Sequence, residues 1–130
     1  MGSDFLDRTE DLDGVLTYEN GKIIGLGLYY IKENNCEIVL LETFIQNKGI
    51  GTQIIEKIRE IAKTKNCKRI WLITTNDNID AIKFYQRKGF NIGSFYKNAI
   101  DKSRELKPEI PIIGNYDISI RDEIEFELKI

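Results

Sequence analysis

The heptapeptide Gln46–Thr52 has the residue types of an anion-binding turn, because it combines two glycines with four side chains that can hydrogen-bond. Gly49 and Gly51 lack a Cβ atom, so backbone amides there can approach a pyrophosphate closely. The side chains of Gln46, Lys48 and Thr52 can add hydrogen bonds. Two glycines alone are a weak signal, since Gly49 could simply turn the chain while Gly51 starts a helix.

Other nucleotide motifs fit this turn poorly. A Walker P-loop requires Gly-Lys-Ser/Thr after its last glycine, where this chain has Gly51-Thr52-Gln53. A Rossmann fingerprint requires a third glycine where Ile54 stands. The turn therefore disfavours ATP and NAD as ligands.

A second set of residues has helical spacing. Asn78, Ala81 and Tyr85 stand at i, i+3 and i+7, which places an amide, a small side chain and a phenol on one helix face. Such a line can flank an extended ligand, and a phenol can act as a general acid. The alternative for Tyr85 is packing in the core, the commoner role of an aromatic residue at this spacing.

Carboxylates are the remaining candidates for acid-base chemistry, because the chain contains no histidine. This excludes a Ser-His-Asp triad and argues against a catalytic zinc site. Glu37 and Glu42 are the candidate general bases. We prefer Glu42, because it follows the apolar run Ile38–Leu41, where a buried carboxylate would need a partner. Alternatively, Glu37 is exposed at a strand end and Glu42 occupies a bulge that faces solvent. Arg121, Asp122 and Glu123 could reach the same cleft, but a solvated turn is the preferred interpretation.

Hydrophobic periodicity and turn residues predict the elements that position these groups. An Asn20-Gly21 turn predicts a hairpin, and Gly25 and Gly27 within its second strand indicate a bulge or a close backbone approach. Asn78 has the chemistry of a helix N-cap and Gly89 that of a C-cap. The expected strands are 15–18, 23–31, a central strand 36–45, 68–75, 90–97 and 124–130, and the expected helices are 49–66, 79–88 and, as a helix or irregular turn, 98–106.

Length and composition predict one cytoplasmic domain, residues 1–130. The net charge of -2 argues against nucleic acid or an anionic membrane surface as a partner. The longest apolar run, Ile38–Leu41, is far shorter than the roughly 20 residues of a membrane span, and no leader sequence opens the chain. Cys36 and Cys67 form no C-x-x-C pair, so both are expected to be small buried or half-buried residues, with no metal bound.

Residues 37–90 resemble the core of the GNAT N-acetyltransferase superfamily. The family motif Arg/Gln-x-x-Gly-x-Gly/Ala is matched by Gln46, Gly49 and Gly51. A second motif, Asn-x-x-Ala-x-x-aromatic-Tyr-x-x-x-Gly-Phe, is matched by Asn78, Ala81, Phe84, Tyr85, Gly89 and Phe90. The resemblance implies an α/β (α+β) fold with a mixed, mostly antiparallel central sheet and a strand-helix-strand core that binds coenzyme A.

The resemblance also implies roles for individual residues. The coenzyme A pyrophosphate would lie on the turn formed by Gln46, Asn47, Lys48, Gly49, Ile50, Gly51 and Thr52. Thr43 and Phe44 would pair with pantetheine, and Asn78, with Ala81 beside it, would bind the pantetheine arm. Tyr85 would lie near the sulfur and, with an ordinary pKa of about 10, protonate the departing thiolate.

The implied reaction is transfer of an acetyl group from acetyl-coenzyme A to a primary amine of a small molecule or peptide. A non-catalytic acyl-coenzyme A sensor or interaction module is the alternative, and a small α/β module that binds no nucleotide is the third. Glu37 resembles the base of histone-acetylating members, whereas Ile73 replaces a glutamate found in members that acetylate protein N-termini.

The chain also departs from the family pattern. Only about a dozen residues precede the first hairpin, where family members usually have a strand and one or two helices. This shortened N-terminus predicts an acceptor side that is open, completed by residues 98–122, or completed by a second subunit in a homodimer. The runs Thr74–Asn78 and Ile120–Glu125 resemble those of an uncharacterised subgroup.

Overall fold

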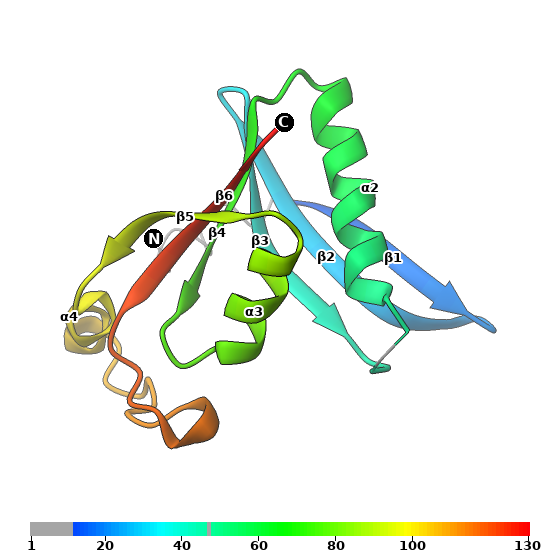
Figure 1. Ribbon diagram of the computed structural model, residues 1–130. Helices are drawn as coiled ribbons and strands as arrows, with labels where there is room; N and C mark the ends of the chain where they lie inside the picture. The colour runs from blue at the N-terminus through cyan, green and yellow to red at the C-terminus, as the bar shows by residue number, and fades with distance from the viewer. Residues whose placement is uncertain (1–11, 47) are drawn as a thin grey trace. The chain divides into compact units, whose positions relative to one another are not determined.

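The computed structural model describes residues 12–46 and 48–130 (Figure 1). The predictions made for Asn47 and for residues 1–11, including the shortened N-terminus, lie outside the described residues. The elements are β1 (Asp13–Glu19), β2 (Lys22–Lys32), β3 (Asn35–Thr43), α2 (Ile50–Thr64), β4 (Arg69–Thr75), α3 (Ile79–Arg87), β5 (Asn91–Tyr96), α4 (Ala99–Leu106), η2 (Asn115–Asp117) and β6 (Glu123–Lys129).

The strands form a six-stranded sheet in the order β1-β2-β3-β4-β6-β5. Strands β1, β2 and β3 pair antiparallel in succession, β3 pairs parallel with β4, and β5 pairs antiparallel with β6. This confirms the predicted mixed, mostly antiparallel sheet. The chain divides into two compact units, the first reaching to Trp71 and including Lys129–Ile130, the second spanning Leu72–Leu128. The predicted organisation as one domain, 1–130, stays a prediction.

The first unit begins with the predicted hairpin. Asn20 and Gly21 both have positive φ, 51° and 80°, as a two-residue turn between twisted strands requires. Helix α2 lies along one face of the hairpin strands (Figure 1). A Cβ atom on Gly27 would lie 2.5 Å from Ile54 Cγ2, and one on Gly25 would lie 2.5 Å from Ile50 Cγ2. The predicted close approach is therefore confirmed, and it is the approach of helix to strand.

The core of the first unit is aliphatic. The buried face of α2 consists of Ile50, Ile54, Ile55, Ile58 and Ala62. Cys36 and Cys67 are free thiols and both are buried, as predicted. Burial is the main cause that raises the pKa of the Cys36 thiol, to about 12, so it remains a neutral, unreactive core residue at physiological pH.

The second unit is organised around α3. The side chain of Asn78 accepts a hydrogen bond from the Ala81 amide at 3.3 Å, which makes it the predicted N-cap. Gly89, at φ 96°, follows the helix as predicted. Beyond β5, the predicted segment 98–106 contains helix α4, Ala99–Leu106, rather than an irregular turn. Within the described ranges, no helix combines the length and apolar character that crossing a membrane demands.

Candidate functional site

The start of helix α2 has the geometry of an anion site. Gly49 is the N-cap residue, with φ 67° in the left-handed region, and none of the side chains that the structure describes caps the helix. The first amides of a helix have no intrahelical acceptor, and the helix dipole adds positive potential there. No acidic residue occupies the first turn of α2. The amides of Ile50, Gly51 and Thr52 can therefore bind an anion.

Lys48 adds a mobile positive charge to this turn. Its Nζ lies 3.5 Å from Oε1 of Glu19, at the end of the β1–β2 hairpin. Both side chains are about half exposed, so the pair is screened by solvent and holds Lys48 weakly. An arriving phosphate can compete with Glu19 for the ammonium group.

At the end of β3, backbone groups are available to a ligand only on the strand edge that faces away from β2. The Phe44 amide donates to the Ile24 carbonyl at 2.9 Å, so it is used within the β2–β3 pair. Because backbone groups alternate along a strand, the Thr43 amide and carbonyl point to the opposite edge. The register of β3 with β4 covers Asn35–Glu37 and Arg69–Trp71. Thr43 can thus pair with an extended ligand, whereas Phe44 offers its exposed side chain.

A β-bulge places the two candidate bases on one face of the sheet. Leu28 pairs with Leu40 and Tyr29 with Ile38, which leaves one extra residue in β3. Glu37 and Glu42 are five residues apart and would otherwise face opposite sides. Their partners in β2, Tyr30 and Leu26, lie on the face away from Gly25 and Gly27.

Both carboxylates therefore lie on the face opposite α2. Glu37 is half-buried and has interactions with neighbouring groups. Glu42 is exposed, so the alternative that it faces solvent is confirmed, and the burial considered for it is not found. The cause is strand alternation, which turns Glu42 outward while the neighbouring residues Leu41 and Thr43 are half-buried.

On α3, the cap orients the Asn78 amide. Its Oδ1 accepts from the Ala81 amide. This leaves the two hydrogens of Nδ2 to donate to a ligand carbonyl. Ala81 itself is half-buried on the same helix face, where its small side chain leaves room beside Asn78.

Tyr85 is fixed by aromatic packing. Its ring makes edge contacts with Phe84 at 5.1 Å and Phe90 at 5.4 Å between centroids, and lies 6.3 Å from Phe126. Burial raises the pKa of the phenol well above its ordinary value, so the expectation of an ordinary pKa is wrong. The phenol stays protonated at neutral pH, as a general acid must, but it is a weaker acid than an exposed tyrosine.

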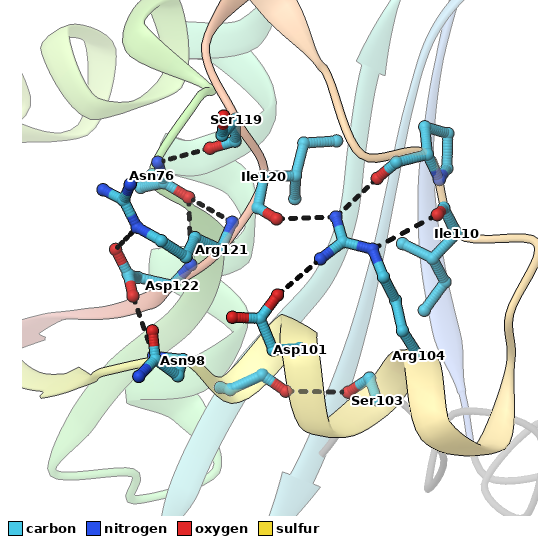
Figure 2. Close-up of polar contacts among 12 residues, drawn as sticks. Asn76, Asn98, Asp101, Ser103, Arg104, Ile110, Ser119, Ile120, Arg121 and Asp122 are labelled. Carbon is cyan, nitrogen blue, oxygen red and sulfur yellow. Dashed lines mark hydrogen bonds and ion pairs between the residues drawn. The ribbon is translucent and has the colours of Figure 1, made fainter.

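The turn before β6 also differs from its interpretation as a solvated turn. Asp122 is buried and accepts hydrogen bonds from the Asn98 amide at 2.8 Å and from Arg121 Nε at 3.1 Å (Figure 2). The Asn98 amide is the largest cause that lowers the pKa of the Asp122 carboxyl, and Arg121 adds to it. The turn is a structural anchor. Glu123 is half-buried, and burial raises the pKa of its carboxyl.

Sequence reasoning missed the residues that support the start of α3. Asn76 Oδ1 accepts from the amides of Arg121 and Asp122, at 2.9 Å and 3.0 Å (Figure 2). Asp77 is buried and accepts from Thr75 Oγ1 at 2.5 Å and from the Asn115 amide at 2.9 Å. The signal was present in the polar run Thr74–Asn78, which is denser in hydrogen-bonding side chains than one helix cap requires.

The predicted site residues thus form two groups. Thr43, Phe44 and the binding turn belong to the first unit together with both glutamates, and Asn78, Ala81 and Tyr85 belong to the second. Gln46 is exposed at the start of the turn. Among the described residues, no three His, Cys, Asp or Glu side chains are grouped in a way that could hold a metal ion.

Comparison with known proteins gives consistent matches over most of the chain. Residues 3–90 match the family model of the acetyltransferase (GNAT) family. The chain is 48% identical over 120 residues to "Uncharacterized protein YdhI" of Bacillus subtilis strain 168, covering 92% of this chain and 75% of that protein. This agrees with the expected uncharacterised subgroup.

Two further matches concern proteins with a described activity or ligand. The chain is 34% identical over 84 residues to the spermine/spermidine N(1)-acetyltransferase of Bacillus subtilis strain 168, covering 56% of this chain and 55% of that protein. Its fold is similar to that of a GNAT family acetyltransferase from Elizabethkingia anophelis crystallised with acetyl-CoA, with TM-score 0.85, 23% identity, and coverage of 100% and 84% of the two chains.

Proposed function

Because the chain belongs to the GNAT acetyltransferase family, we propose that it transfers the acetyl group of acetyl-coenzyme A to a primary amine of a small molecule or peptide. The observation that carries this proposal is the uncapped start of α2 at a left-handed Gly49. Such a helix start is suited to a pyrophosphate. The acetyl-CoA-bound structure of similar fold supports the same ligand.

Different residues would contact different parts of the cofactor. The amides of Ile50 to Thr52 would bind the pyrophosphate, with the Lys48 ammonium balancing its charge. The outward backbone groups of Thr43 would pair with the pantetheine amides, as one strand pairs with another. The Nδ2 group of Asn78 would donate to a pantetheine carbonyl.

The chemistry is direct attack of a neutral amine on the thioester carbonyl. A tetrahedral intermediate forms with a positively charged nitrogen, which loses a proton to water or to a carboxylate. Its C–S bond then breaks, and the departing thiolate takes a proton. Tyr85 would supply that proton, because burial keeps its phenol protonated throughout the neutral range. Its raised pKa makes the transfer uphill, so the resulting tyrosinate must regain a proton before the next turnover.

The amine must lose a proton before it attacks, since its pKa is about 10. Glu37 and Glu42 are the proposed bases, acting directly or through water, because the bulge places both on one face of the sheet. Glu42 is exposed to water, whereas Glu37 is half-buried. Replacing each by glutamine separates the two candidates, because the variant that lacks the base should lose activity most strongly at low pH.

Two measurements test the proposed function. Acetyl-coenzyme A should raise the melting temperature of the protein, by several degrees at 100 times Kd. Release of free thiol should then depend on an added amine, in a panel that includes spermidine because of the related polyamine enzyme. Binding without turnover for every amine would favour the alternative, a non-catalytic acyl-coenzyme A sensor. Absence of binding would contradict both.

Tyr85→Phe tests the general acid. The ring contacts remain, so the fold and the KM for acetyl-coenzyme A should be unchanged, while kcat falls about 10²- to 10⁴-fold. Tyr18→Phe is the matched control, because Tyr18 is an exposed tyrosine of β1. Equal kcat for Tyr85→Phe and the wild type would exclude the phenol as the acid.

We also propose that the protein acts in the cytoplasm, as one domain, without a metal ion and without nucleic acid or membrane as a partner. The net charge of -2 supports the absence of nucleic acid. A homodimer is tested by light scattering during size-exclusion chromatography. A mass of about 15.1 kDa would show a monomer.

A further inference from the structure

Trp71, the single tryptophan of the chain, lies at the end of the β3–β4 pairing, in register with Glu37. It therefore shares with Glu37 the face of the sheet opposite α2. The Arg69 guanidinium lies over the indole, with Cζ 5.4 Å from the ring centroid. Arg69 Nε in turn donates to Asn35 Oδ1 at 3.1 Å. These contacts join Asn35, Arg69 and Trp71 into one cluster.

The cluster restrains the indole without burying it. Contact between a guanidinium and an aromatic face is favourable, and more so where water is partly excluded. Arg69 and Trp71 are both half-buried, as is Asn35, which fixes the guanidinium by accepting from Nε. The ring thus keeps one orientation while part of it stays accessible to a ligand.

The edge of β3 that would pair with pantetheine leads toward this ring. The proposed pairing starts at Thr43, and the register with β4 ends at Glu37. From its first amide, the pantetheine arm continues for about seven bonds to the sulfur, roughly 9 Å, the length of two to three extended residues. The thioester sulfur would therefore lie beside Leu40, with the acyl carbons directed toward Glu37.

An acyl chain that continues past Leu40 meets different surroundings on the two faces of the sheet. On the α2 face, Cys36, Ile38 and Ile70 are 0%, 4% and 0% exposed, so core side chains fill that side. On the opposite face, Leu40 and Trp71 are only half-buried. All of these residues belong to the first unit. A longer chain therefore runs along the face opposite α2, and its end approaches Trp71.

The distance to the ring limits the length of that chain. The bulge adds one residue between Leu40 and Glu37, so these positions are separated by about two strand rises, roughly 7 Å. Contact with the indole takes up about 3.5–4.0 Å of this distance. An acetyl group extends roughly 2.5 Å beyond the sulfur and fits. A hexanoyl chain is about 5 Å longer and would collide with the ring.

We propose that Trp71 is a specificity-determining residue that excludes medium-chain acyl groups from the donor site, with Arg69 and Asn35 as the positioning residues that hold its ring. This role rests on the proposed coenzyme A site, and it adds which acyl thioesters that site accepts. The alternative is a purely structural cluster at the end of the β3–β4 pairing.

Isothermal titration with acetyl- and hexanoyl-coenzyme A tests selection without requiring turnover. The wild type should bind hexanoyl-coenzyme A about 10-fold more weakly than acetyl-coenzyme A. Trp71→Ala should remove this difference, and Trp71→Phe should keep part of it. Leu16→Ala is the matched control, because Leu16 pairs with Leu26 on the same face but belongs to β1. It should leave the ratio of the two Kd values unchanged.

Substitutions of Asn35 test the positioning residues. Asn35→Ala removes the acceptor of Arg69 Nε and should reduce the discrimination about 3-fold. Asn35→Asp keeps an acceptor and should preserve the discrimination. Melting temperatures are measured in parallel, because a merely structural role would lower them without changing the ratio of the Kd values.

Fluorescence keeps the test independent of variants that fail to fold. Because Trp71 is the single tryptophan, its emission reports on the ring directly. Saturating hexanoyl-coenzyme A should shift the emission maximum of the wild type relative to coenzyme A without an acyl group. Identical spectra with these two ligands would show that the chain does not reach the ring.

The outcomes separate this role from the proposed function. Identical spectra, or a wild-type ratio of Kd values retained in Trp71→Ala, overturn the role of Trp71 alone. Selection by chain length in a protein that acetylates no amine supports the role of Trp71 and overturns the proposed transfer. Failure to bind either thioester overturns both.

Discussion

Adding one methyl group to Gly27 should separate helix α2 from the sheet. A Cβ atom at this position would lie 2.5 Å from Ile54 Cγ2 and 3.2 Å from Ile58 Cδ1. Carbon atoms in contact normally lie about 3.5–4.0 Å apart, so the helix must retreat by roughly 1 Å. Ile54 and Ile58 are both fully buried. We expect Gly27→Ala to lower the free energy of unfolding by about 1–3 kcal/mol.

The same displacement should weaken cofactor binding. Helix α2 starts at Ile50, and its first amides are the proposed pyrophosphate donors. A hydrogen bond that lengthens by roughly 1 Å is largely lost. We expect the Kd for acetyl-coenzyme A to rise about 10-fold, although Gly27 itself contacts no proposed ligand.

Urea unfolding and isothermal titration with acetyl-coenzyme A measure the two effects. Gly14→Ala is the matched control, because its Cβ would meet only one flexible side-chain end, Leu28 Cδ2 at 3.3 Å, and a backbone oxygen. A second test combines Gly27→Ala with Ile54→Ala. Removing Cγ2 of Ile54 relieves the collision, so the double variant should be less destabilised than the sum of the single variants.

Two results would refute this reasoning. Equal midpoints of urea unfolding for Gly27→Ala and Gly14→Ala would mean that the helix is not held by the close approach. Alternatively, additive effects of Gly27→Ala and Ile54→Ala would mean that these two positions do not share the collision.

Further predictions concern charged groups. Asp122→Asn should destabilise the protein by about 1–3 kcal/mol at neutral pH, because the buried carboxylate accepts from the Asn98 amide. Since the folded pKa is lowered, this stabilisation is present above the unfolded pKa of about 3.9 and is lost as the pH falls through the folded value, so melting curves of variant and wild type should converge in acid. Lys48→Ala should weaken acetyl-coenzyme A binding, and the effect should shrink at high salt. Glu19→Gln should strengthen binding up to about 3-fold by releasing Lys48, and unchanged titration isotherms would contradict this.

The sequence by itself determined the elements and the family. The Asn20-Gly21 turn, the Asn78 cap and the apolar stripe of α2 are local signals, because each depends on residues a few positions apart. Gly25 and Gly27 also indicated that another segment of the backbone packs closely against their strand. Both motifs led to the acetyltransferase family because they prescribe backbone shape and side-chain spacing within single elements.

Tertiary structure determined the orientation and the pKa of the candidate catalytic side chains. One extra residue in β3 sets the face of Glu37 and Glu42, and no pattern within the strand marks it. Packing against Phe90 and Phe126 raises the pKa of Tyr85, although those rings are distant in the sequence from one another.

The hydrogen bonds that anchor residues 98–122 could not be predicted from the sequence either. In the sequence, Asp122 is one charged residue in a polar turn. In the structure, it accepts a hydrogen bond from the Asn98 amide, 24 positions earlier. Burial and hydrogen bonding depend on which distant segments meet, and a pKa follows from both. Local spacing therefore predicted the helices, the strands and the turn between β3 and α2. Only the folded structure shows which carboxylates are buried and which face water.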